Sequence, residues 1–171
     1  MIQNSGIIKK IYFPRLIIPS ASILVNLFDF LMAFLIFLVI AFVYHGISWM
    51  ALFYFPLALL LTLLSAFGLG SFLAALNIKF RDFRYALPFL LQILFFASQV
   101  IYPIRLVEQT ELKYLLALNP INGAIELFRS PLLNVSPDLT IVWISVGSAL
   151  FLCLLGLSYF RKTESYFADI A

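Results

Sequence analysis

Few side chains in this chain of 171 residues could do chemistry, because only 11% of them are charged. No Asp, Glu, Lys or Arg occurs from Phe30 to Ile78, and residues 85–104 are uncharged as well. Between these runs lies a short basic stretch, NIKFRDFR. It contains the charged residues Lys79, Arg81, Asp82 and Arg84.

The patterns that usually carry catalysis or metal binding are absent. The sequence has no GxxxxGK[ST] loop to hold nucleotide phosphates, no HExxH pair, and no cluster of His, Cys or carboxylates. Its single cysteine, Cys153, excludes an intramolecular disulfide and a Cys-based metal site, and is expected to be a small core residue. We therefore predict no catalytic residue, no metal site, no cofactor and no enzymatic activity of its own.

The composition is that of a membrane protein, since 64% of the residues are hydrophobic, whereas soluble domains are about 45–50% apolar and about 25% charged. A helix needs about 20 apolar residues to cross roughly 30 Å of hydrocarbon. The alternating pattern of a membrane barrel is absent, and helices satisfy their own backbone groups in lipid. The sequence predicts an all-α membrane protein with four transmembrane helices, at about residues 22–44, 49–76, 85–104 and 139–160.

Asp29 is the only acidic residue inside one of these predicted spans, and Asn26 lies one helical turn before it on the same face. Ionisable groups at membrane depth are costly and often mark function. Three interpretations stay open for this intramembrane polar pair. The carboxylate could face other helices or an aqueous cavity with a partner, lie near the interface, or carry protons or ions.

The distribution of positive charge predicts the orientation of the chain. Cytoplasmic loops retain Lys and Arg, and eight of the eleven such residues lie on one side if both termini are cytoplasmic. Residues 77–84 then form a short cytoplasmic turn, and residues 105–138 lie outside. The net charge of +3 therefore reflects membrane topology and does not indicate a nucleic acid partner.

Residues 1–21 precede the first predicted span and mix basic with apolar and aromatic side chains. This pattern favours an amphipathic element at the cytoplasmic membrane surface. Pro14 and Pro19 are expected to break it before the span begins.

Residues 105–138 are too polar to cross the membrane and too apolar for a solvated loop. They predict two short amphipathic helices at the outer interface. The first covers 112–118 and stops before Pro120. The second is capped by Asn122, runs from Gly123 to about Ser130, and is ended by Pro131. An ordinary interfacial loop is the alternative.

Small residues recur every fourth position in the second predicted span, at Ala66, Gly70 and Ala74. Such a stripe lets another helix backbone approach closely. Packing within the chain and contact with another subunit both stay open.

Four stretches occur in a characteristic order: IIKKIYFPRLIIPSASILVN, FGLGSFLAALNIKFRDFRYALPFLLQ, ALNPINGAIELFRSPLL and FRKTESYFADI. Together they resemble the membrane subunit of ABC-2 type transporters that export O-antigen, capsular polysaccharide or teichoic acid. The likeness covers nearly the whole chain. Members of that family normally have six spans, so this chain is expected to be a single transmembrane domain forming roughly the C-terminal two thirds of such a permease.

The resemblance implies a homodimeric permease of the bacterial inner membrane, surrounded by membrane lipid. It implies a separate ABC ATPase subunit that binds ATP and Mg, and a substrate glycan attached to a polyprenyl diphosphate lipid. It assigns ATPase coupling to residues 1–21 and to the 77–84 turn, namely to Lys9, Lys10, Tyr12, Phe13, Pro14, Arg15, Lys79, Arg81 and Asp82. It assigns an outer gate hairpin to residues 105–138, with Asn119, Pro120, Glu126 and Arg129. Two alternatives are an ABC-2 exporter of a drug or small lipid, and a non-transporting membrane scaffold subunit.

Overall fold

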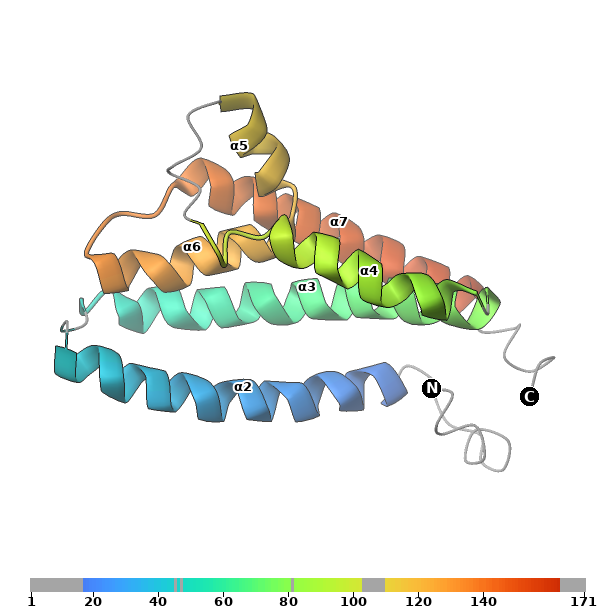
Figure 1. The fold of residues 1–171 in the computed structure, drawn as a ribbon, viewed down its shortest axis with the longest axis horizontal. Helices are drawn as coiled ribbons and strands as arrows, with labels where there is room; N and C mark the ends of the chain where they lie inside the picture. The colour runs from blue at the N-terminus through green and yellow to red at the C-terminus, as the bar shows by residue number, and fades with distance from the viewer. Residues whose placement is uncertain (1–16, 45, 47, 81, 103–109, 164–171) are drawn as a thin grey trace.

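The computed structural model describes residues 17–44, 46, 48–80, 82–102 and 110–163. In these ranges the chain forms six helices and no strands, which confirms the predicted all-α class (Figure 1). The helices are α2 (Ile17–Tyr44), α3 (Ala51–Lys79), α4 (Phe83–Phe96), α5 (Thr110–Ala117), α6 (Pro120–Leu133) and α7 (Leu139–Thr163).

Three of these helices, α2, α3 and α7, contain segments long and apolar enough to cross a membrane, at Pro19–Val43, Ala51–Asn77 and Leu139–Thr163. They correspond to the first, second and fourth predicted spans. Helix α4 has only 14 residues, which gives a length of about 21 Å, less than the hydrocarbon thickness. The third predicted span is therefore not one continuous helix, because residues 97–102 form turns and bends.

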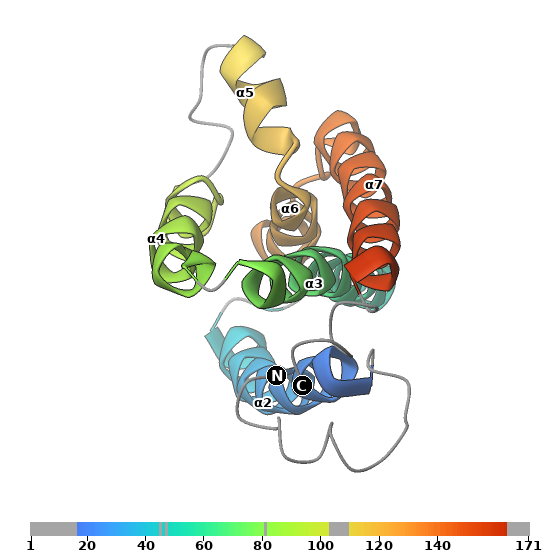
Figure 2. The same cartoon turned by 90° about the vertical axis from the view of Figure 1, so that its right-hand side faces the viewer.

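Helix α3 lies at the centre of the arrangement. Figure 1 shows α2, α3 and α7 running along the long axis, with the beginning of α2 and the end of α7 at the same end. In the end view, α2 lies on one side of α3, while α6 and α7 lie on the other (Figure 2). Helix α6 follows the half of α3 that begins at Ala51, and α4 lies beside the half that ends at Lys79.

The core between α3, α6 and α7 is built mainly from small and medium side chains, at Ala58, Leu61, Ala124, Leu127, Val142 and Ala149. In lipid, helices associate through close packing rather than through the hydrophobic effect, so small residues at the contact are favourable. Helices α3 and α7 approach closely where Gly68 meets Gly156. A Cβ atom on Gly156 would lie 2.3 Å from the Gly68 carbonyl oxygen, and one on Gly68 would lie 2.7 Å from the Cys153 backbone nitrogen.

The predicted small-residue stripe lies beside this contact and not in it. Ala66 is exposed, and a Cβ atom on Gly70 would be 3.9 Å from Ile23 of α2. Ala74 packs at the edge of a small cluster formed by α3 and α7. Gly68 is two positions from both Ala66 and Gly70, so it lies on the other side of the helix from them. A role of the stripe in subunit contact stays a prediction.

Two predicted helix breaks are absent. Helix α2 begins at Ile17 and contains Pro19 in its first turn, where the missing N–H has no helical acceptor to lose. The expectation that Pro19 ends a separate surface element is therefore wrong. Helix α6 continues through Pro131 to Leu133 and ends at Asn134, which adopts the left-handed conformation with φ 53°.

Candidate functional site

The end of α4 is held by side chains of α6. Backbone groups at membrane depth need partners inside the protein once a helix stops. The Gln99 N–H donates to Asn122 Oδ1 at 2.8 Å, and Gln99 Nε2 donates to the Asn122 carbonyl oxygen. Asn122 Nδ2 donates to the Ala97 carbonyl oxygen at 3.2 Å. These bonds replace part of the helical ladder that α4 loses after Phe96.

Arg129 completes this arrangement from two turns further along α6. Its Nη2 donates to the Gln99 carbonyl oxygen at 3.0 Å, so α6 side chains bind both backbone groups of Gln99. Nη1 of Arg129 is buried and has no hydrogen-bond partner in the described part of the chain. We call Ala97, Gln99, Asn122 and Arg129 the clamp. Gln99 and Asn122 are 1% and 0% exposed, which explains why irregular backbone is tolerated at this depth.

The clamp continues into α5 and α7. Asn122 Nδ2 also donates to the Leu116 carbonyl oxygen at 2.7 Å, near the end of α5. Ser145 of α7 donates to the Ala117 carbonyl oxygen at 2.9 Å and accepts from the Gly123 N–H at 3.0 Å. A Cβ atom at Gly123 would lie 2.5 Å from Ser145 Cβ, so this contact requires glycine.

The two predicted short helices exist as α5 and α6, so the alternative of an ordinary loop is wrong. Asn122 is not the cap. Asn119 has that role, since its side chain accepts from the Ile121 N–H at 3.2 Å, with Pro120 in the first turn. Helix α6 runs along α3 inside the bundle and has eight buried residues. Small residues on α6 allow this burial. The predicted position of the two helices at the outer interface stays a prediction. The gating role of the hairpin stays a prediction.

Polar contacts join the hairpin to the start of α7. Glu126 is 2% exposed, and its Oε1 accepts from the Asp138 N–H at 3.4 Å. Lys113 Nζ lies 2.6 Å from Asp138 Oδ2. The hydrogen bond from Lys113 lowers the pKa of the Asp138 carboxyl below its ordinary value, against the opposing effect of burial. This ion pair connects α5 with the beginning of α7.

Aromatic rings attach α2 to the rest of the molecule. Phe34 of α2 lies with its ring centroid 5.1 Å from that of Phe55 and 5.2 Å from that of Phe128, both close to edge-to-face. Phe30 lies 5.9 Å from Phe128. An apolar groove of about 620 Å³ opens beside these rings, between α2 and α3, with Trp49 in its lining. Such ring pairs each contribute about 0.5–1.5 kcal/mol beyond area burial.

The turn between α3 and α4 presents charge at the end of the molecule opposite the groove. Lys79 Nζ lies 5.4 Å from the Phe80 ring centroid and 5.8 Å from that of Tyr159, within cation–π range. Asp82 is the residue before α4 and makes no capping hydrogen bond, and Arg84 is exposed. The other predicted coupling residues lie outside the described residues: Lys9, Lys10, Tyr12, Phe13, Pro14, Arg15 and Arg81.

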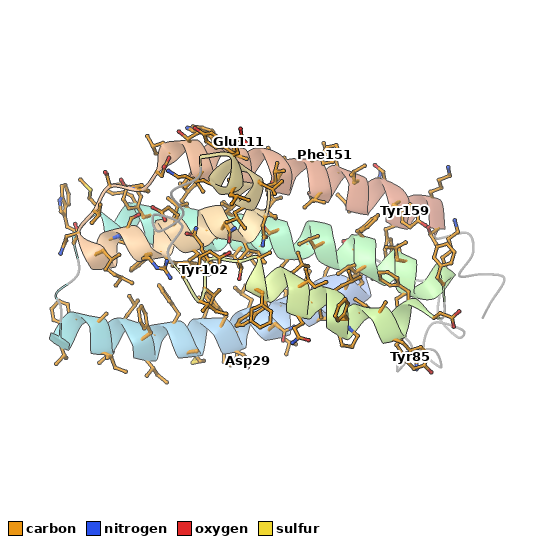
Figure 3. The ribbon with its side chains drawn as sticks, turned by 45° about the horizontal axis from the view of Figure 1, so that its top comes forward. Asp29, Tyr85, Tyr102, Glu111, Phe151 and Tyr159 are labelled. Carbon is orange, nitrogen blue, oxygen red and sulfur yellow. The ribbon has the colours of Figure 1, made fainter. Side chains whose placement is uncertain are left out.

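The intramembrane polar pair lies on α2. Asn26 Nδ2 donates to the Ser22 carbonyl oxygen of its own helix at 2.9 Å. Asp29 is exposed and makes no hydrogen bond or ion pair with any residue that the structure describes (Figure 3). The half-buried side chains of α2 that lie against α3 include Ile23, near Gly70, and Phe34, against Phe55. Any partner of Asp29 would have to come from outside the described residues, so its role stays a prediction.

Within the described ranges, no three His, Cys, Asp or Glu side chains gather to hold a metal ion. The three helices long and apolar enough to cross a membrane are typical of a multi-pass membrane protein. Residues 2–133 match the ABC-2 type transporter family, and the chain belongs to this family.

Three relatives are all named "O-antigen export system permease protein RfbA". Two from Klebsiella pneumoniae are 26% and 27% identical over 99% of this chain and 65% of their own length. One from Myxococcus xanthus is 31% identical over 69% of this chain and 46% of its own. The chain thus spans about 65% of the length of the Klebsiella relatives.

Proposed function

We propose that this chain is the membrane-spanning part of an ABC exporter that moves a lipid-linked polysaccharide across the bacterial inner membrane. The observation that carries the proposal is the similarity to proteins named O-antigen export permeases along 99% of the chain, together with membership of the ABC-2 family. In this proposal the permease forms a homodimer. Energy comes from a separate ATPase subunit that binds ATP and Mg, since the sequence has no phosphate-binding loop.

The α3–α4 turn is the part of the described structure that best fits an ATPase contact. It carries Lys79, Asp82 and Arg84 at the end of the molecule where α2 begins and α7 ends. The last turn of α7 adds Arg161 and Lys162 at the same end. A concentration of positive charge at one end is typical of the cytoplasmic side, where ATP is available. The predicted N-terminal coupling segment would add to this surface.

The proposal is tested by deleting the gene for the permease and by purifying the tagged protein with its neighbours. We expect loss of surface glycan in the deletion strain and co-purification of an ABC ATPase. Unchanged glycan together with no bound ATPase would contradict the proposal. Drug accumulation with normal surface glycan would instead indicate an exporter of small molecules.

Reversing a charge at the α3–α4 turn tests whether this turn contacts the ATPase. Because Arg84 is exposed beside the turn, Arg84→Glu should reduce the amount of co-purified ATPase about tenfold, as expected when an interface cation becomes repulsive. The matched control is Glu111→Lys, an exposed reversal at the start of α5, which should leave binding unchanged. Equal ATPase recovery with both variants would place the contact elsewhere.

A further inference from the structure

Helix α4 is attached to the rest of the described structure mainly at its two ends. None of its 14 residues is buried, although it lies beside α3 (Figure 2). At one end, a turn of three residues connects it to α3, with the Phe83 N–H donating to the Phe80 carbonyl oxygen at 3.1 Å. At the other end is the clamp. A helix held in this way is fixed at its ends and contributes no buried residue to the core.

The clamp is the firmer of the two attachments. In the clamp, side chains take the place of backbone groups as hydrogen-bond partners of the main chain. The Asn122 amide contributes its oxygen as an acceptor and both of its N–H hydrogens as donors. Gln99 and Asn122 are essentially inaccessible to solvent. Hydrogen bonds in such a low-dielectric site strengthen, and breaking one leaves a buried group unpaired.

The partner of α4 in this clamp is itself fixed. Helix α6 packs along α3 and α7, with the Gly123 N–H bonded to Ser145. The same serine holds the end of α5 through the Ala117 carbonyl oxygen. The clamp therefore connects the loosely packed α4 to the best-packed part of the fold.

We infer that Gln99 and Asn122 are positioning residues that make α4 and the α5–α6 hairpin move as one body. The irregular backbone at residues 97–99 then acts as a rigid corner and not as a hinge. This coupling of α4 to the hairpin does not depend on the identity of the substrate. Its consequence for transport rests on the proposed function. If the α3–α4 turn contacts the ATPase, displacement of that turn reaches the hairpin through α4.

Pulsed electron paramagnetic resonance on the full chain in lipid nanodiscs tests this inference. Cys153→Ala removes the single cysteine, and spin labels are placed at the exposed positions of Leu91→Cys on α4 and Leu115→Cys on α5. The parent protein should give one narrow distance distribution. Asn122→Ala should widen it roughly twofold, because the corner loses the three hydrogen bonds of the Asn122 side chain, and Gln99→Ala should widen it less, because the backbone bonds of Gln99 remain.

Two controls separate a local clamp from general destabilisation. Gln92→Ala removes an exposed glutamine from the same helix and should leave the distribution narrow. A second label pair, Leu60→Cys with Leu154→Cys, reports on α3 and α7 and should not change in any variant. Widening of both pairs together would indicate a merely structural role and overturn the inference.

Gln99→Met provides a milder variant in case Asn122→Ala does not fold. Like Gln99→Ala, it removes the side-chain hydrogen bond to the Asn122 carbonyl and keeps the two backbone bonds of Gln99, but methionine also fills most of the space of the glutamine side chain. We expect widening between that of the parent and that of Gln99→Ala. A broad distribution in the parent protein, or a narrow one in every clamp variant, would contradict the inference.

Discussion

Asn122 and Gly156 both act through backbone contacts, one by hydrogen bonding and the other by having no side chain. Asn122 forms hydrogen bonds with backbone groups of two other segments, at residues 97–99 and at Leu116. Gly156 lets α7 touch the backbone of α3. Residues of this kind fix the positions of helices whose surfaces are otherwise apolar and unspecific.

Gly156→Ala is predicted to destabilise the protein, because the new Cβ atom would lie 2.3 Å from the Gly68 carbonyl oxygen. Relief of this overlap requires α3 and α7 to separate, at a cost of about 1–3 kcal/mol. Thermal unfolding of the purified protein in detergent measures the effect. The control is Gly147→Ala on the same helix, where no atom lies within 4 Å of the new Cβ atom. Equal melting temperatures for the two variants would refute the close contact.

Lys113→Met is predicted to have a small, pH-dependent effect on stability. Since the pKa of Asp138 is lowered in the folded protein, the ion pair stabilises the fold above the ordinary value of 3.8. This contribution is lost as the pH falls through the lowered pKa. At pH 7 the variant should lose less than about 1 kcal/mol, because the pair is partly exposed.

Thermal unfolding at neutral pH and at about pH 3 checks this prediction. The difference in melting temperature between the variant and the parent should shrink at the lower pH, where Asp138 approaches protonation. An equal difference at both values would show that Lys113 stabilises the protein through packing alone.

At the scale of the helices, Phe128 joins three of them. Its ring contacts Phe30 and Phe34 of α2 and Phe55 of α3. Phe128→Ala should weaken the attachment of α2 and cost about 1–2 kcal/mol, less than for a fully buried ring because lipid can fill part of the space. Limited proteolysis and thermal unfolding measure the change.

Phe151→Ala is the matched control for this prediction. Phe151 lies on α7 and is 61% exposed (Figure 3). It should therefore leave both protease sensitivity and the melting temperature close to those of the parent. If the two variants behaved alike, the phenylalanine cluster would not hold α2 in place.

The long helices could be predicted because each one contains its own signal, a continuous run of mostly apolar residues. Uncharged runs of sufficient length identified α2, α3 and α7 within a few residues at each end. The break after Phe96 was not predicted, because residues 97–102 are nearly as apolar as the helix before them. The polar residue that marked it was Gln99, and its partner Asn122 lies 23 residues away in the sequence.

The roles of site residues were predictable where the signal is local and were missed where they depend on tertiary contacts. Asn119 and Pro120 form a local cap signature, yet the sequence pattern predicts Asn122 as the cap, because a polar residue before an apolar run fits both positions. Gly68 and Gly156 could not be paired from the sequence, since spacing along one helix does not reveal which face meets another. The positions of Arg129 and Glu126 depend on how α6 packs, which is a tertiary property.

For the whole molecule, the arrangement of helix ends gives a simple topology. The beginning of α2, the α3–α4 turn and the end of α7 lie at one end, and the start of α6 lies toward the middle (Figure 1). Most side chains of α2 face outward, and none in its apolar window is buried. Such a surface suits contact with lipid or with other helices.

The central claim is that the basic α3–α4 turn and the connection between α6 and α7, which lie at opposite ends of the long helices, face opposite sides of the same membrane (Figure 1). Thiol labelling with a membrane-impermeant maleimide tests it, using Arg84→Cys and Val135→Cys separately in the Cys153→Ala background, since both positions are exposed. In spheroplasts, Val135→Cys should react, and Arg84→Cys should react only after the membrane is opened. Labelling of Arg84→Cys from outside, with Val135→Cys protected, would contradict this topology.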